Sequence, residues 1–372
     1  MGKTMESAAS EPTIQREFPC MNCGAGLAFA PGTDSLVCAH CGTRNPIACA
    51  AETIEESEYL TGLASLAATE ERVETLTFRC SRCGAATSLP ANVTADLCPF
   101  CGSAVVAEAA SGKRIRPGYL LPFHVTSEQA MAAFRRWIAT RWFAPSCLRA
   151  SANAGRLLGI YMPAWTYNCD TSTRYTGQRG DDYWETEHYT AHENGRSVRK
   201  TRQVRKTRWT HVSGRVENRF CNLLVRASES LPEEYFHDLE PWDLDNLVAY
   251  RDEYLAGFVC ESYQIDLETG FAHAKQDMEG PIHQSICEDI GGDHQRVHEV
   301  STQYSNITYK HILLPVWLSA YRYRDRSYRF LVNARTGEVR GERPWSLWKI
   351  GAAVLMALAG IAAVLVATNV FR

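Results

Sequence analysis

The cysteines of this chain fall into two sets with one spacing. Eight of them form Cys-x-x-Cys pairs: Cys20, Cys23, Cys38, Cys41, Cys80, Cys83, Cys98 and Cys101. Each set has the form Cys-x2-Cys-x14-Cys-x2-Cys, and a glycine follows the second cysteine of every pair. Each pair can present two thiolates from one tight turn, and four thiolates complete the tetrahedral shell of a zinc ion. The spacing therefore predicts two zinc ribbons, at residues 17–48 and 77–108, that hold two structural Zn2+ ions.

A shell of four thiolates leaves no open position for a substrate, so both sites are expected to be structural rather than catalytic. Other signals of enzyme chemistry are weak. The segment Ala110–Arg114 lacks the first glycine of a phosphate-binding loop, because residue 107 is alanine. The single cysteines have no adjacent base to activate them. We therefore predict that the protein is not an enzyme, has no small-molecule substrate and uses its ribbons as binding platforms.

The segments that flank the first ribbon differ sharply in composition. Residues 1–16 are expected to be a disordered leader, and no apolar signal segment precedes the first cysteine. Residues 49–76 form a connector in which Ala51–Thr75 carries seven acidic residues and one basic residue. A weak helical stripe runs through it at Ile54, Leu60 and Leu63. A negative segment beside the ribbons opposes contact with phosphates, so it favours a protein partner over nucleic acid.

The C-terminal segment 345–371 has the composition of a membrane anchor. Ile350–Ala367 is an uncharged run of 18 residues, about 27 Å long as a helix. Trp345, Trp348 and Lys349 precede it where residues of the membrane interface are expected. Basic residues lie mainly on the N-terminal side of the run, so the rest of the chain is expected in the cytoplasm, at the inner face of the plasma membrane. Unpaired cysteines elsewhere agree with a reducing compartment.

Residues 113–343 are expected to form a β-rich mixed domain with a few helices. Thr126-x-x-Gln129 resembles a capping box that opens a helix. Met278, Ile282, Ile286 and Ile290 step at four and predict a second helix, with a kink at Gly280-Pro281. Two strand-like segments share a Pro-x-Trp rhythm, at Pro163/Trp165 and Pro315/Trp317. The predicted fold class is therefore α+β, with two zinc ribbons, this domain and one C-terminal transmembrane helix.

A basic run within this domain allows two interpretations. Seven basic residues and no acidic one lie between Arg196 and Arg208, although the whole chain is nearly balanced at 39 basic and 42 acidic residues. Asn194-Gly195 is a strong hairpin turn, and folding about it pairs Glu187 with Arg202 and Asp181 with Arg208. The first interpretation is therefore a hairpin whose charges pair with each other. The alternative is an anion-binding surface made by Arg199, Lys200, Arg202, Arg205, Lys206 and Arg208.

The cysteine sets, the segment Leu314-Pro315-Val316-Trp317 with its partner Asn333-x-x-Thr336-Gly337, and the C-terminal run together resemble a known family. It is a group of bacterial TFIIB-type zinc-ribbon membrane proteins, often labelled primosomal protein N′-like or helicase-like. The missing phosphate-binding loop does not support a helicase activity. The resemblance implies genes beside flotillin-like (SPFH) and phage-shock-type proteins, and a role in tethering soluble partners to the membrane.

The sequence thus leads to one functional hypothesis and one alternative. We expect a membrane-anchored zinc-ribbon adaptor that recruits cytoplasmic partners, of the flotillin-like or membrane-stress type. Two-dimensional tethering would raise the partner's effective concentration without a catalytic step. The alternative is a membrane-tethered protein that binds nucleic acid through its ribbons and the basic strand, with a steep dependence on salt.

Overall fold

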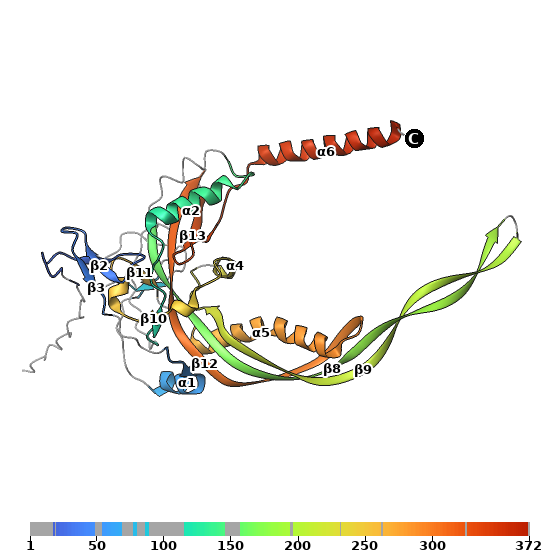
Figure 1. Ribbon diagram of the computed structural model, residues 1–372, viewed down its shortest axis with the longest axis horizontal. Coiled ribbons are helices and arrows are strands. Elements are labelled where there is room, and N and C mark those ends of the chain that lie inside the picture. The colour runs from blue at the N-terminus through green and yellow to red at the C-terminus, as the bar shows by residue number, and fades with distance from the viewer. Residues whose placement is uncertain are drawn as a thin grey trace, which may run out of the picture.

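Three very long strands dominate the structure. They are β8 (Leu158–Glu193), β9 (Arg196–Arg226) and β12 (His294–Tyr323), with 36, 31 and 30 residues. They lie side by side in one strongly curved sheet, with β8 between β9 and β12 (Figure 1). This computed structural model describes residues 18, 20–48, 54–68, 77–79, 86–88, 115–145, 157–193, 196–230, 232–261, 263–323 and 326–370.

Shorter strands extend this sheet at the end where the first cysteine set lies. They are β4 (Ser57–Glu58), β5 (Thr77–Arg79), β6 (Ala86–Ser88), β7 (Tyr119–Leu120), β10 (Val248–Ala249), β11 (Val259–Glu261), β13 (Arg326–Asn333) and β14 (Val339–Gly341). A separate small sheet is made by β1 (Leu27–Phe29), β2 (Ser35–Cys38) and β3 (Arg44–Pro46).

The two copies of the Pro-x-Trp rhythm lie on neighbouring antiparallel strands. In the pairing of β8 with β12, Pro163 lies opposite Leu313 and Pro315 lies opposite Tyr161. The two strand-like segments that share this rhythm therefore lie next to each other in the sheet, where both are buried. Strands covered on both faces favour apolar residues without strict alternation, which is how these two segments read.

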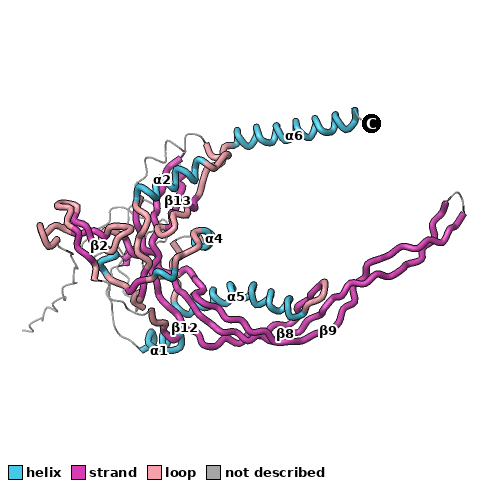
Figure 2. The backbone as a smooth tube through the Cα atoms, viewed as in Figure 1, coloured by secondary structure: helices cyan, strands magenta, loops and turns pink. Residues whose placement is uncertain are grey.

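Helix α5 (Leu267–Ile290) covers the concave face of the long strands (Figure 2). It begins at Asp266, whose side chain accepts a hydrogen bond from the Thr269 backbone N–H at 2.7 Å. The predicted stripe is buried as expected, at Met278, Ile282, Ile286 and Ile290. The helix continues through Pro281 as one element, so Gly280-Pro281 does not divide it.

The N-terminus of α5 is held on the sheet by two buried aromatic side chains of β8. Trp165 Nε1 donates to the Ile265 carbonyl at 2.9 Å, and Tyr167 Oη donates to the Leu267 carbonyl at 2.8 Å. Both rings are fully buried. Because each polar atom has a backbone partner, the aromatic surface is buried without an unsatisfied donor.

Helix α2 (Ser127–Ala139) packs beside β13 and β14, in the same core as the first cysteine ribbon. The capping box at Thr126 and Gln129 is confirmed, since each side chain accepts a hydrogen bond from the other residue's backbone N–H. Phe134 stacks on Phe330 of β13 with ring centroids 3.4 Å apart. The other α-helices within the described residues are short or terminal: α1 (Tyr59–Ala68), α4 (Glu233–Asp238) and α6 (Leu347–Val370).

The predicted fold class is wrong, because the described part of the chain is mostly β-sheet. The sheet curls into half of a barrel and the helices are few, whereas an α+β fold with a β-rich mixed domain and a transmembrane helix was expected (Figure 1). Ordinary strands have about five or six residues, and the sequence shows strand character only in separate segments, the Pro-x-Trp segment and the charged hairpin about Asn194-Gly195. It does not show that β8 runs unbroken from Leu158 to Glu193, and this explains the difference.

The predicted transmembrane anchor is also wrong. No helix within the described residues is both long and apolar enough to cross a bilayer. The single-pass anchor at 345–371 and the location at the plasma membrane, which depended on it, are therefore withdrawn. The prediction depended on the absence of charged residues in Ile350–Ala367. In the structure, the start of α6 is held by hydrogen bonds to the loop after α2. Lys349 Nζ donates there to the carbonyls of Trp142 and Ala144, at 3.1 and 2.8 Å.

Candidate metal centre

The first cysteine set forms two matching turns. The Gly24 N–H donates to the Cys20 carbonyl at 2.8 Å, and the Gly42 N–H donates to the Cys38 carbonyl at 2.9 Å. Gly24 and Gly42 both have φ of 72°. A Cβ at either glycine would meet nothing within 4 Å, so the backbone conformation, and not lack of space, calls for glycine. This accounts for the glycine that follows the second cysteine of each pair in the first set.

The four thiols of these turns converge on one point. The Sγ atoms of Cys20 and Cys41 are 3.6 Å apart, those of Cys23 and Cys38 are 3.5 Å apart, and all four lie within 4.8 Å of one another. A tetrahedral ion with metal–sulfur bonds of about 2.3 Å requires sulfur separations of about 3.8 Å. The cluster therefore could hold one metal ion, with four protein ligands and no open position.

Hydrogen bonds around the thiols favour their ionised forms at two positions. The Thr43 hydroxyl and backbone N–H lower the pKa of Cys41 to about 5. The backbone N–H groups of Asn22 and Cys23 lower the pKa of Cys20. At Cys23 the Ala25 backbone N–H favours the thiolate, but the neighbouring thiols outweigh it and the pKa rises to about 12. Four thiolates this close need the charge of a cation to ionise together.

The ribbon is docked on the main sheet and does not stand alone. The Phe29 N–H donates to the Ala256 carbonyl and the Gly32 N–H to the Phe123 carbonyl, both at 2.9 Å. Phe29 and Leu36 are buried in the same core as residues of α2 and β13. This docking side is therefore occupied. The turns that carry the cysteines face outward, and Met21 at one turn is 90% exposed.

The second cysteine set, Cys80, Cys83, Cys98 and Cys101, lies outside the described residues. Two strands of its segment are described, β5 and β6, and they pair with each other. Strand β6 also pairs with β11, with Ser88 opposite Cys260. The chain around the second set is therefore joined to the main sheet. Of the two predicted metal sites, the described part of the chain shows one that could hold an ion.

The predicted hairpin is confirmed pair by pair. Glu193 lies opposite Arg196, Glu187 opposite Arg202 and Asp181 opposite Arg208. The Asn194-Gly195 turn itself lies outside the described residues. The register follows the sequence because side chains alternate between faces, so one residue of slippage would move every charge to the other face.

The six residues of the predicted anion-binding surface all lie on β9, and Arg202, Arg205 and Lys206 form ion pairs with β8. Arg202 pairs with Glu187 at 3.0 Å, Lys206 pairs with Glu185 at 2.7 Å, and Arg205 pairs with Asp182. The Arg208 guanidinium lies 5.1 Å from the centre of the Tyr183 ring. Arg199 and Lys200 lie nearer the tip, opposite Thr190 and Tyr189.

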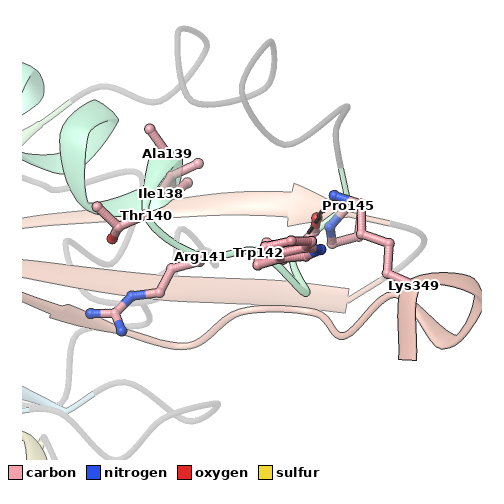
Figure 3. Close-up of a pocket in the computed structure, with 8 residues that line it drawn as sticks. Ile138, Ala139, Thr140, Arg141, Trp142, Pro145 and Lys349 are labelled. Atoms are coloured by element: carbon pink, nitrogen blue, oxygen red, sulfur yellow. Dashed lines mark hydrogen bonds between the residues drawn. The ribbon is translucent and has the colours of Figure 1, made fainter. Parts of the chain in front are cut away.

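The residues predicted at a membrane interface gather near the loop after α2. Trp345 is 57% exposed, with its ring centroid 6.3 Å from that of Phe143, and Trp348 is 85% exposed. Lys349, together with Arg141 and Trp142, lines a cavity of about 330 Å3 (Figure 3). Because the Lys349 ammonium donates hydrogen bonds to backbone carbonyls of this loop, it attaches α6 to the body.

Several buried polar groups were not found from the sequence, among them Glu261 and Lys310. Glu261 on β11 is 1% exposed; it accepts a hydrogen bond from the Ser230 hydroxyl, and burial raises its pKa to about 8. Lys310 on β12 is also buried, and its Nζ donates to Glu56 at 2.9 Å and to Asn222 at 2.8 Å. A charged residue next to the apolar run 312–318 was the one local sign of the Lys310 site.

The fold and the site together define a class: a β-rich protein with a four-cysteine ribbon, able to hold a metal ion, docked on a long curved sheet. No family model matches the chain. No solved structure matches it either. The chain is similar to an uncharacterized protein, YdjG, of Bacillus subtilis, with 28% identity over 345 residues. That match covers 90% of this chain and 92% of the Bacillus protein.

Proposed function

We propose that the protein is a non-enzymatic zinc-ribbon adaptor, which binds a protein partner through the outward face of its metal ribbon. The observation that carries the proposal is the closed set of four converging thiols, Cys20, Cys23, Cys38 and Cys41. Zinc favours four thiolates in a tetrahedron, and such a site stabilises a fold and leaves no place for substrate. By the same spacing, the second cysteine set holds a second zinc ion.

The exposed face of the ribbon supports a protein partner. Met21 projects from the first cysteine turn with 90% of its surface exposed. Methionine is enriched in protein interfaces because its flexible thioether adapts to different surfaces. The opposite side of the ribbon is fixed to the body by Phe29 and Gly32, so the metal turns are held at a set position. The resemblance stated above makes flotillin-like and phage-shock-type proteins the first partners to test.

The metal part of the proposal is tested by counting zinc. The purified full chain is expected to carry two zinc ions. Cys41→Ser is expected to lose one of them, and Cys98→Ser the other. His40→Ala is the matched control, since His40 is exposed within the first set and is not a ligand. A wild-type chain that folds fully without zinc would overturn this part.

The adaptor part is tested by capture of a flotillin-like or phage-shock-type protein on the immobilised full chain. Met21→Glu is expected to weaken capture at least tenfold while the zinc content stays unchanged. If the Met21→Glu chain captures the partner as well as the wild-type chain does, the cysteine turns are not the contact face. Failure to capture either protein class would refute the partner assignment.

A second candidate function, binding of nucleic acid, has one observation in its favour. Seven basic residues lie between Arg196 and Arg208 on one exposed strand. Phosphate contacts by these residues would give binding that weakens steeply as salt increases. Retention on duplex DNA at low salt, lost when Arg199 and Lys200 are replaced by glutamine, would favour this candidate.

A further inference from the structure

The hairpin of β8 and β9 continues far beyond the rest of the sheet. Strand β12 pairs with β8 as far as Gly180, which lies opposite His294. Helix α5 ends at Ile290, just before the start of β12. We call the two-stranded part beyond this point, residues 181–193 and 196–208, the arm. It projects away from the body as a twisted ribbon (Figures 1 and 2).

Opposite charges are separated onto the two strands of the arm. The β8 side carries five acidic residues and no lysine or arginine: Asp181, Asp182, Glu185, Glu187 and Glu193. The β9 side carries seven basic residues and no acidic one: Arg196, Arg199, Lys200, Arg202, Arg205, Lys206 and Arg208. One long edge of the arm is therefore acidic and the other is basic.

Both outer edges of the arm lack a neighbouring strand among the described residues. Beyond Gly180 strand β8 pairs with β9 alone, and β9 pairs with β8 alone. Side chains of the arm are also exposed, including Trp184 at 67% and Tyr189 at 41%. A two-stranded ribbon is marginally stable in water, and a third strand adds both backbone hydrogen bonds and covered side chains.

The separation of charge decides which strand can add to which edge. Two basic edges repel each other, and so do two acidic edges. A basic edge of one copy beside an acidic edge of another copy repeats the pairing that already exists within the arm, where Arg202 meets Glu187 at 3.0 Å and Lys206 meets Glu185 at 2.7 Å. A copy turned end for end, so that the two bodies lie at opposite ends of the joined arms, places β9 parallel to the next β8, and strands also pair in this direction.

We propose that the arm is a self-association surface, in which β9 of one copy pairs with β8 of a second copy. The contact is head-to-tail, because it joins two different edges, and it therefore leads to a ring or a filament of copies. The inference goes beyond the adaptor function and does not depend on the metal sites. The partner is a second copy of this chain, and backbone pairing with matched charge is what recognises it.

The first experiment measures the mass of the purified full chain by light scattering as its concentration rises. The wild type is expected to at least double in average mass and to return toward the monomer at high salt. A shortened arm, made by deleting residues 183–192 and 197–206, keeps Asp182 opposite Thr207 and joins them to the original turn. This variant is expected to stay monomeric with its zinc content and thermal midpoint unchanged.

The second experiment exchanges the charges within the arm. The four changes E185K, E187R, R202E and K206E preserve the net charge and the pairs inside the hairpin. This variant is expected to associate with itself, because its edges remain complementary. It is expected to be captured by tagged wild-type chain at least tenfold less than wild-type chain is, because like charges then meet at the contact.

Three results would overturn the proposal. The wild type could remain monomeric at every concentration, the shortened arm could associate as well as the wild type, or the exchanged variant could mix freely with the wild type. A monomeric wild type that binds duplex DNA through its arm belongs to the first of these, and it would assign the basic edge to an anionic partner instead.

Discussion

Burial of Glu261 predicts that stability falls as the pH rises through neutrality. The side chain is 1% exposed, and its Oε2 atom has no hydrogen-bond partner among the described residues. Burial raises its pKa from 4.5 in the unfolded chain to about 8. Between these two pH values the folded state holds one more proton than the unfolded state. Its stabilising contribution is therefore complete below pH 4.5 and is lost by about pH 8.

The size of this effect follows from the pKa difference. Each unit is worth about 1.4 kcal/mol, so the interval from 4.5 to about 8 corresponds to about 5 kcal/mol. Over the two pH units from 6 to 8 the expected loss is about 2–3 kcal/mol. Glu261→Gln keeps the shape and the acceptor for the Ser230 hydroxyl but does not ionise, so it is expected to lose this dependence on pH.

The assay is urea unfolding of the full chain at several values of pH between 6 and 8.5, with zinc present throughout. The free energy of unfolding of the wild type is expected to fall with pH, and that of Glu261→Gln to stay level in comparison. Parallel lines for the two proteins would refute the reasoning, because another group would then cause the slope. Staying above pH 6 also avoids release of metal by protonated thiols.

Two further predictions concern the contact between helix and sheet and a second deeply buried titratable group, His311. Gly270→Ala would place a Cβ 2.6 Å from the Tyr167 hydroxyl, so it is expected to lower the free energy of unfolding by about 1–3 kcal/mol. Gly280→Ala is the control on the same helix, because its Cβ would meet nothing within 4 Å, and it is expected to be neutral or to stabilise by about 0.5–1 kcal/mol. The urea midpoints of the two variants measure these effects. Burial lowers the pKa of His311 from 6.5 to about 4. The contribution of neutral His311 to stability is therefore complete above pH 6.5 and is lost as the pH falls through 4, a loss of up to about 3 kcal/mol. His311→Gln is expected to reduce this fall in the free energy of unfolding at acid pH.

Local patterns in the sequence predicted the parts of the molecule that local geometry determines. The cysteine spacing predicted the thiol cluster of Cys20 to Cys41, because each turn is closed by hydrogen bonds across four residues. The Asn194-Gly195 turn and the alternation of charge predicted that Glu187 lies opposite Arg202. In both cases the interacting residues are close in sequence or are paired by the register of a single hairpin, so the local sequence pattern is enough to predict the contact.

Contacts between distant segments were not predictable in this way. Lys310 and Glu56 form an ion pair across 254 residues, and neither neighbourhood indicates the other. The docking of Phe29 beside Ala256 likewise depends on how the long strands curve, which a single sequence does not reveal. The fold class failed for a related reason, since the length of β8 depends on its pairing with two other long strands and not on its own residues.

The position of α5 has a mechanical consequence for the hairpin. Up to Gly180 the sheet has three strands and a helix packed on its concave face, and it is therefore stiff. Past that residue two strands continue alone over residues 181–193, about 40 Å at 3.3 Å per residue. Bending is therefore expected to concentrate in the two-stranded part beyond Gly180, so the arm can change its direction relative to the body without disturbing the core.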